Sequence, residues 1–109
     1  MKVTDYLNIP YRIESEALET ATDVWVRRVR LPELAAATAE SESIEDALTM
    51  LERRRIELII EMLRAGRKPP VPRSPLVHNV TASTLQRLGL TRFTPLLDQD
   101  ADELAAGPA

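Results

Sequence analysis

The sequence predicts an α+β fold in which one long helix packs on a three- or four-stranded antiparallel sheet, with a short C-terminal helix and a flexible tail. Three observations predict it: apolar and polar residues alternate over 6–14, β-branched residues crowd 24–31, and apolar residues recur at helical spacing from residue 44. The chain has 109 residues, of which 44% are hydrophobic. This length fits one domain and not two.

Two antiparallel strands are expected first. Segment 6–14 (YLNIPYRIE) has the period of a half-buried strand, and Pro10 confines it to a sheet edge. Segment 24–31 (VWVRRVRL) is the second strand, in which a slip at 27–28 brings the apolar residues Val24, Val26, Val29 and Leu31 to the inner face. The polar residues 15–23 connect the two strands. Residues 34–39 fit a third strand or a helix, because alanine dominates them.

The long helix has the clearest boundaries. Ser43 and Asp46 form a variant of the capping box, and Gly66 can adopt the left-handed conformation that ends a helix. A helix of about 22 residues and ~33 Å is therefore predicted. Its core-facing stripe comprises Ile44, Ala47, Leu48, Leu51, Leu58, Ile59 and Met62, and Arg55 projects onto the same face. Arg55 must therefore extend to the core edge or meet an acid from another element.

The C-terminal third is expected to be irregular. Residues 76–80 fit one more strand, and residues 82–88 fit a short helix capped by Thr81 and ended by Gly89. The last dozen residues, 98–109, have the composition of a disordered acidic tail.

Composition limits the chemistry. The chain has no cysteine and one histidine, His78, so thiolate zinc sites and histidine-based triads are not expected. Glu14 and Asp23 could be relics of a two-metal nuclease site, but such a site needs more converging carboxylates, and solvated acids are the favoured interpretation. We therefore expect no catalytic residue, no metal and no cofactor.

The sequence also indicates the location of the protein and the partners that its charge disfavours. No apolar run reaches the length of a membrane span, and no secretory signal is visible, so a cytoplasmic protein without membrane contact is expected. The net charge is −3, which disfavours binding to a phosphate backbone. Basic residues at Arg27, Arg28 and Arg30 and at 53–55 could form a stripe for RNA, although interleaved glutamates favour a solvated, salt-bridged helix face.

A second apolar line runs along the long helix through Ile56, Ile60 and Leu63. One sheet buries only one arc of a helix, so this line needs another surface. Residues 76–97 could cover it, or it could be a partner or dimer interface. The open edge of strand 6–14 or 24–31 adds to the expectation of a homodimer.

Two segments in the middle of the chain, LPELAAATAESESIEDAL (31–48) and LRAGRKPPVP (63–72), contain Pro32, Ser43, Ala47, Gly66 and Pro70. In the spacing of these residues the chain resembles the HicB-like antitoxin family of toxin–antitoxin systems. The connection ESEALETATD is longer than the family's tight hairpin turn. The resemblance implies a partial, catalytically inert RNase H-like fold over 1–72, followed by an extension over 73–97 and the tail over 98–109.

The resemblance also implies a function. Members of the family commonly bind and mask a small basic RNA-cleaving toxin. We expect the acidic residues Glu40, Glu42, Asp98, Asp100, Asp102 and Glu103 to meet such a partner. No DNA-binding module is visible after Pro72, so nucleic-acid binding without a partner is not expected. The alternative is a nucleic-acid-binding regulator that uses the strand and helix arginines.

Overall fold

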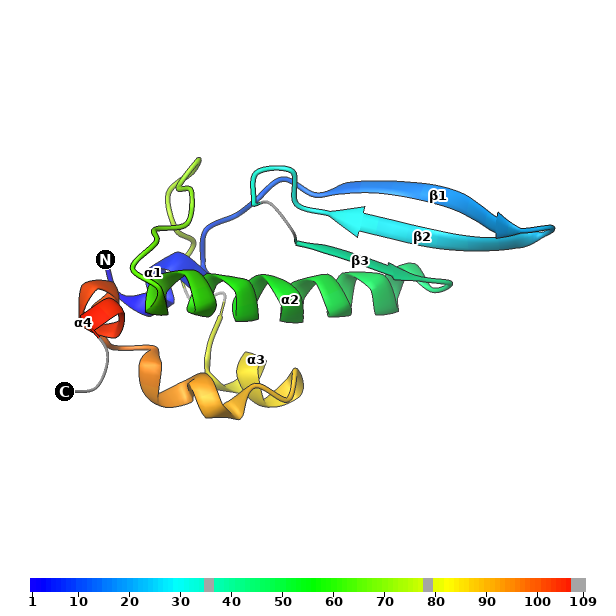
Figure 1. The fold of residues 1–109 in the computed structure, drawn as a ribbon. Helices are drawn as coiled ribbons and strands as arrows, with labels where there is room; N and C mark the ends of the chain where they lie inside the picture. The colour runs from blue at the N-terminus through cyan, green and yellow to red at the C-terminus, as the bar shows by residue number, and fades with distance from the viewer. Residues whose placement is uncertain (35–36, 78–79, 107–109) are drawn as a thin grey trace. The chain divides into compact units, whose positions relative to one another are not determined.

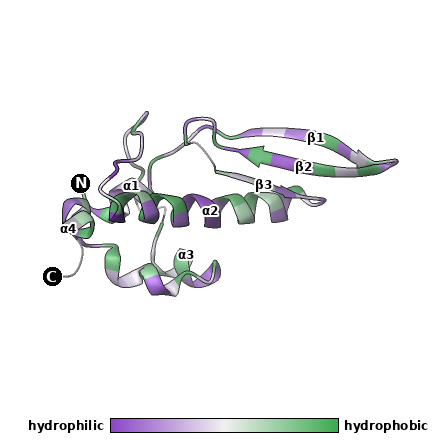
Figure 2. Cartoon of the chain, in the orientation of Figure 1, coloured by the Kyte–Doolittle hydropathy of each residue, from purple (hydrophilic) through white to green (hydrophobic). Residues whose placement is uncertain are grey.

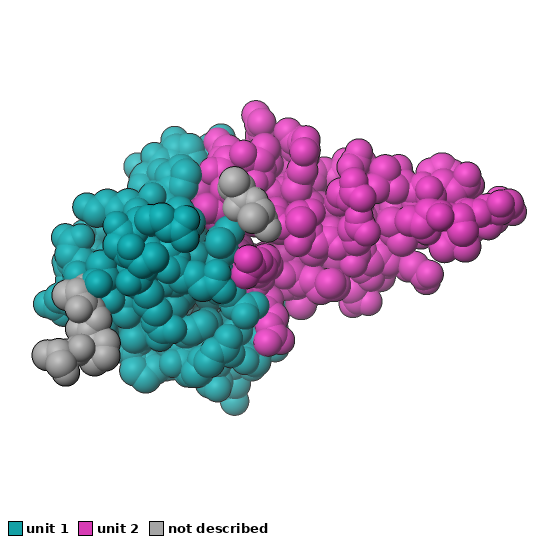
Figure 3. Space-filling view, viewed as in Figure 1, with its two compact units in different colours: residues 1–10, 56–109 teal, residues 11–55 magenta. Residues whose placement is uncertain are grey.

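The structure, a computed structural model, describes residues 1–34, 37–77 and 80–106. The chain forms two compact units (Figure 3): unit 1 comprises Met1–Pro10 and Ile56–Ala109, and unit 2 comprises Tyr11–Arg55. This division differs from the boundaries expected at residues 72 and 97, because the first ten residues belong with the C-terminal half of the chain.

Unit 2 contains the antiparallel sheet expected from the sequence. Its three strands are β1 (Glu14–Ala21), β2 (Val24–Arg30) and β3 (Thr38–Ser41), in the order β1-β2-β3 (Figure 1). Helix α2 (Ile44–Arg64) begins in this unit, and its first half lies along one face of the sheet. The buried residues there are Val29 and Ala39 on the sheet and Ala47 and Leu51 on the helix. The α+β class with one long helix is therefore confirmed.

The first strand lies later in the chain than predicted. Residues 8–13 have no regular structure, and β1 occupies most of the stretch expected to be a connection. The turn is only Thr22 and Asp23, so the connection is not long. Asp23 has φ 60°, a left-handed conformation that aspartate tolerates better than most residues. Strand propensity failed here because β1 is exposed on most of its length and shows no apolar alternation.

The second strand is confirmed, but its expected slip is not. Cα pairing runs without interruption from Glu14 opposite Arg30 to Glu19 opposite Trp25, and the irregularity lies in β1 between Glu19 and Ala21. Val26 and Val29 therefore point to opposite faces of the sheet. Of segment 34–39, only Thr38 and Ala39 lie in β3, and residues 35–36 lie outside the described residues.

Both ends of α2 form as their sequence indicates. The Asp46 amide donates a hydrogen bond to Ser43 Oγ at 3.3 Å. At the other end Gly66 has φ 75°, and the amides of Arg67 and Gly66 bond the carbonyls of Met62 and Leu63 at 2.8 and 3.1 Å. This is the Schellman pattern, which explains why the helix ends at Arg64.

Burial along α2 changes character at its midpoint. Figure 2 shows hydrophobic and hydrophilic residues intermixed along the whole helix. In the half that belongs to unit 2, Ile44 and Leu48 are each 39% exposed although they were expected to be core. A wide arc is buried in the other half: Ile56, Leu58, Ile59, Ile60 and Leu63. Leu51 and Leu58 are core residues, as predicted.

Unit 1 joins the two ends of the chain. Helix α1 (Val3–Leu7) is held by the C-terminal segment, since the Val3 amide bonds Gln99 O at 2.9 Å and the Ala101 amide bonds Met1 O at 3.0 Å. Buried Asn8 extends this connection: its Oδ1 accepts from the Val80 amide, and its carbonyl accepts from the Leu76 amide at 2.8 Å. Of segment 76–80, the described residues form no strand, and His78 lies outside the described residues.

The remaining elements of unit 1 are short. Helix α3 (Ala82–Arg87) is confirmed, with Thr81 as N-cap and Gly89 at φ 71°. It is followed by the 3₁₀ helix η1 (Thr91–Leu96) and by helix α4 (Ala101–Ala106). The expectation of a disordered tail is wrong for residues 101–106, because Ala101 and Leu104 are buried. None of the helices in the described ranges is long and apolar enough to cross a membrane.

Candidate protein-binding surface

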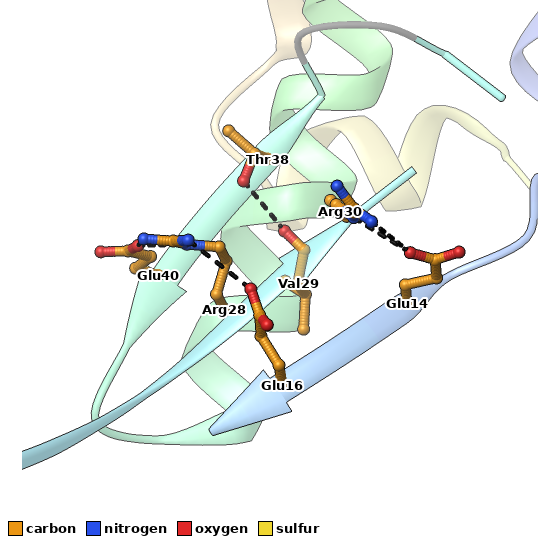
Figure 4. A network of polar contacts seen from close by, with 7 residues as sticks. All are labelled: Glu14, Glu16, Arg28, Val29, Arg30, Thr38 and Glu40. Carbon is orange, nitrogen blue, oxygen red and sulfur yellow. Dashed lines mark hydrogen bonds and ion pairs between the residues drawn. The ribbon is translucent and has the colours of Figure 1, made fainter. Parts of the chain in front are cut away.

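The face of the sheet turned away from α2 carries a ladder of opposite charges, which we call the charge ladder: Glu14, Glu16, Arg28, Arg30 and Glu40 (Figure 4). It arises because the register places glutamates of β1 and β3 directly beside arginines of β2. Residues that face each other on neighbouring strands have side chains on the same side of the sheet. Sequence reasoning missed the charge ladder because it did not assign residues 14–21 to a strand.

Each arginine of the ladder has a carboxylate partner. Arg30 Nε and Nη2 lie 3.0 and 2.7 Å from Glu14 Oε2. Arg28 lies between two acids: its Nη1 is 3.5 Å from Glu16 Oε1, and its Nε and Nη2 both contact Glu40 Oε1. The ladder therefore pairs three carboxylates with two guanidinium groups.

These ion pairs are exposed, with side chains 40–60% accessible to solvent. Exposed pairs of this kind contribute about 0–1 kcal/mol each, so their main effect is on what the surface can bind. A phosphate group would have to displace a glutamate from Arg28 or Arg30. The alternative of an RNA-binding stripe on β2 is therefore disfavoured by the contacts that Arg28 and Arg30 make.

Two depressions lie beside the ladder. One is lined by Glu14, Ser15, Glu16, Arg28 and Arg30, and the other by Arg28, Arg30, Ala37, Thr38, Ala39 and Glu40. Charged side chains line most of the first depression, and alanine and threonine residues join them in the second. Such a surface suits a polypeptide segment better than a buried small molecule.

Beyond the charge ladder, the hairpin of β1 and β2 exposes apolar side chains. Trp25 and Val24 are 55% and 40% exposed, and Leu18 and Val26 are half-buried and lie opposite each other on the ladder face. Tryptophan is rarely left in water without a role and is enriched at protein interfaces. Sequence reasoning missed this group because it placed the valines on the inner face.

The two carboxylates considered as relics of a metal site, Glu14 and Asp23, do not converge. Glu14 is paired with Arg30, whereas Asp23 lies in the hairpin turn, where its amide donates to Glu19 Oε2 at 3.4 Å. In the ranges that the structure describes, no three His, Asp or Glu residues gather where they could hold a metal ion.

Two charged residues near the middle of α2, Arg55 and Glu57, have identified partners. Arg55 is 6% exposed and its Nη2 lies 2.8 Å from Glu52 Oε1, three residues earlier on the same helix. One acid that Arg55 contacts therefore comes from α2 itself. Glu57 contacts Arg92 of η1 at 3.4 Å, and Arg92 lies 4.4 Å from the centre of the Phe93 ring. These contacts attach η1 to the second half of α2.

Ile56, Ile60 and Leu63 do not form the free interface expected from the sequence. Their exposed fractions are 0%, 1% and 2% in the single chain. Arg64 stacks on Phe93 at 5.7 Å from the ring centre, beside the end of this line. The alternative in which the chain covers its own second stripe is the one that agrees with this burial. The stripe therefore offers no surface to a partner in this conformation.

The acids expected to meet a basic partner are divided between the two units. Glu40 and Glu42 belong to unit 2, and Glu40 is part of the charge ladder. The tail acids belong to unit 1, where the backbone of Asp100 pairs with that of Lys2 in an isolated β-bridge and the Asp102 carboxylate lies 3.7 Å from Lys68 Nζ. Unit 2 thus holds both the charge ladder and the exposed hairpin tip.

Comparison with known proteins adds no relative. No protein-family model matches the chain, and neither the curated proteins nor the solved structures give a match.

Proposed function

We propose that this chain is a non-catalytic, cytoplasmic, HicB-like antitoxin or an orphan relative, which binds and masks a small basic RNA-cleaving toxin. The partial RNase H-like assignment is part of this proposal and rests on the resemblance of residues 31–48 and 63–72. The antiparallel sheet with one long helix is consistent with it.

The observation that carries the proposal is the charge ladder. Its two arginines are occupied by Glu14, Glu16 and Glu40; Arg12 also contacts Glu14, whereas the row of Glu16 ends in an exposed carboxylate. A protein with basic side chains can add to this ladder without displacing anything, whereas a nucleic acid cannot. The tip of the same hairpin supplies the apolar contact that slows dissociation: Val24 is exposed on the face of the ladder, and Trp25 is exposed on the opposite face of the strand.

The mechanism would be occlusion. A toxin that cleaves RNA must present cationic side chains to the phosphate backbone. Those side chains would bind the acidic positions of unit 2, and the toxin's RNA-binding surface would then be covered. The attraction between opposite charges raises the association rate, and the apolar hairpin tip sets the lifetime of the complex.

Co-expression tests the proposal. The reading frame next to this gene should encode a short basic protein whose expression alone stops growth and degrades cellular RNA, and this chain should relieve both effects. A Trp25→Ser variant should relieve them less well, whereas Met50→Ser, which changes another exposed apolar residue of unit 2, should not differ from the parent. If the neighbouring product is harmless, or if the chain does not relieve its effect, the proposal fails.

Titration with labelled RNA and DNA tests the alternative function. A nucleic-acid regulator would bind with an affinity that falls steeply with salt, because phosphate contacts release counterions. The charge ladder predicts almost no binding at any salt concentration. Tight, salt-dependent binding that is lost on replacing Arg28 and Arg30 by glutamine would favour the regulator.

A further inference from the structure

The outer edge of β1 is an open sheet edge. β1 is the terminal strand of the order β1-β2-β3 and has eight residues, against four in β3 at the other edge. Within the described ranges, no backbone hydrogen bond joins the outer side of β1 to another segment. An edge of this length presents a row of amide and carbonyl groups that another extended chain can pair with.

The usual devices that protect sheet edges are weak in β1. The strand contains no proline, glycine or lysine, and its register is regular from Glu14 to Glu19. Only the irregularity between Glu19 and Ala21 disturbs the far end of the strand. Its glutamates repel an acidic strand and leave the edge open to a basic one.

The charge ladder shows which charge on a partner strand would be complementary to this edge. In one row, Glu14 lies between Arg30 and the chain's own Arg12, whose Nη2 is 3.4 Å from Glu14 Oε1. The neighbouring row runs Glu40, Arg28, Glu16, and Glu16 is 55% exposed on the open side. Arg12 thus supplies a cation beyond Glu14, whereas the row of Glu16 ends in a carboxylate.

The next row along the strand is apolar. Leu18 pairs with Val26 on the same face as Glu16 and is half-buried. Residues two apart on a strand lie on the same face. A strand added at this edge would therefore meet a carboxylate and, two residues further, an aliphatic side chain.

Resting on the proposed function, we infer that the outer edge of β1 binds an extended segment of the basic partner by strand addition. That segment has a lysine or arginine opposite Glu16 and an aliphatic residue two positions away, opposite Leu18. The backbone supplies the hydrogen bonds of a fourth strand, and the two side chains supply selectivity.

A second copy of this chain fits the edge less well. β1 contains no basic residue, so pairing of β1 with itself puts no cation of that strand opposite Glu16. In the register centred on Glu16 it places two glutamates face to face, which is destabilising. Charge complementarity therefore favours the basic segment.

A synthetic peptide tests the inference on the full chain. The probe is the blocked peptide Thr-Val-Thr-Lys-Thr-Val-Thr, whose symmetric pattern fits a parallel or an antiparallel approach. At millimolar peptide, amide NMR shifts and slowed hydrogen exchange should be confined to residues 14–21 and their neighbours on β2. The same peptide with glutamate in place of lysine should bind more weakly, and an N-methylated form should not bind.

Variants supply the matched comparison. Glu16→Gln should weaken binding of the lysine peptide about 1.5- to 5-fold, the value of one cross-strand charge pair, and Glu16→Lys should weaken it further. Glu45→Gln, which removes an exposed carboxylate from α2, should leave the affinity unchanged. Amide spectra of the free variants report whether β1 and β2 remain paired.

Three results would overturn the inference: no binding at millimolar peptide, equal binding of the lysine and glutamate peptides, or perturbation outside the β1 edge. Protection of the β1 amides on the outer side, which do not face β2, in the chain alone and together with a doubled mass, would assign the edge to a second copy instead. Relief of toxicity in co-expression without protection of these outer amides would overturn this inference alone. Loss of that relief with an intact peptide response would remove only the proposed function.

Discussion

Replacing Ile60 with alanine should cost about 2–5 kcal/mol of unfolding free energy, and Ile44→Ala should cost much less. Ile60 is 1% exposed, so the change loses the transfer free energy of about three methylene groups, ~2.4 kcal/mol, and leaves a cavity. Ile44 is 39% exposed on the same helix, so about three-fifths of the transfer term, ~1.5 kcal/mol, is the upper limit and no closed cavity forms. The gain in helix propensity is smaller at Ile44, the first residue of α2, than at Ile60 in its interior.

Urea unfolding followed by circular dichroism measures the difference. With the usual dependence of stability on urea for small proteins, Ile60→Ala should lower the midpoint by on the order of 1–3 M. Equal midpoint shifts for Ile60→Ala and Ile44→Ala would refute the burial assigned to the second half of α2. If Ile60→Ala instead left the midpoint unchanged and halved the mass seen by light scattering, the stripe would be an interface between two copies.

Further tests concern particular contacts. Deleting 98–109 should lower the melting temperature, because burial of Leu104 is worth about 2 kcal/mol and each hydrogen bond to the N-terminus about 1 kcal/mol. If the tail were disordered, the deletion would leave the melting temperature unchanged. Asn8→Ala should cost about 1–3 kcal/mol in urea unfolding by leaving the Val80 amide without its acceptor, and Asn8→Asp should cost less. Asp23→Val should cost about 1–2 kcal/mol at φ 60°, whereas a stable Asp23→Val protein would contradict that turn. The fluorescence of Trp25, the single tryptophan, should be quenched readily by acrylamide.

Local signals predicted the elements that their own residues define. Both ends of α2 follow from Ser43 and Gly66, and α3 follows from Thr81 and Gly89, because capping hydrogen bonds involve only neighbouring residues. Leu90 and Leu85, which flank the end of α3, are both fully buried, as this type of helix end favours. Such boundaries need no knowledge of the rest of the fold.

Strand β1 could not be predicted in the same way. Its sequence, ESEALETA, is exposed on most of both faces and has no apolar period. Its strand conformation depends on pairing with β2 and on the ion pairs of Glu14 and Glu16 with arginines far along the chain. The charge ladder was therefore also beyond sequence reasoning, because every pair in it depends on that register.

The tail contained a signal that charge composition concealed. The Asp102 amide donates to Asp100 Oδ1 at 2.8 Å at the start of α4, and Ala101 and Leu104 are buried three residues apart. An aspartate before two apolar residues at helical spacing is a recognisable helix start. The prediction of disorder relied on the number of acidic residues and overlooked this helix start. Short acidic segments can fold when they have an apolar side to bury.

The second apolar stripe of α2, Ile56, Ile60 and Leu63, shows that the two halves of one helix can be buried in different ways. Ala47 and Leu51 are buried beside the sheet, while Ile44 and Leu48, which were expected in the same core-facing stripe, remain 39% exposed. From Ile56 onward the apolar arc widens, and the boundary between the two compact units falls at the same residue. A helix that is apolar on more than one side can therefore have either of two causes: a free interface, or surroundings that change along its length. Because Ile56, Ile60 and Leu63 are already covered, contacts with other proteins are better sought at the open edge of β1 and at Trp25.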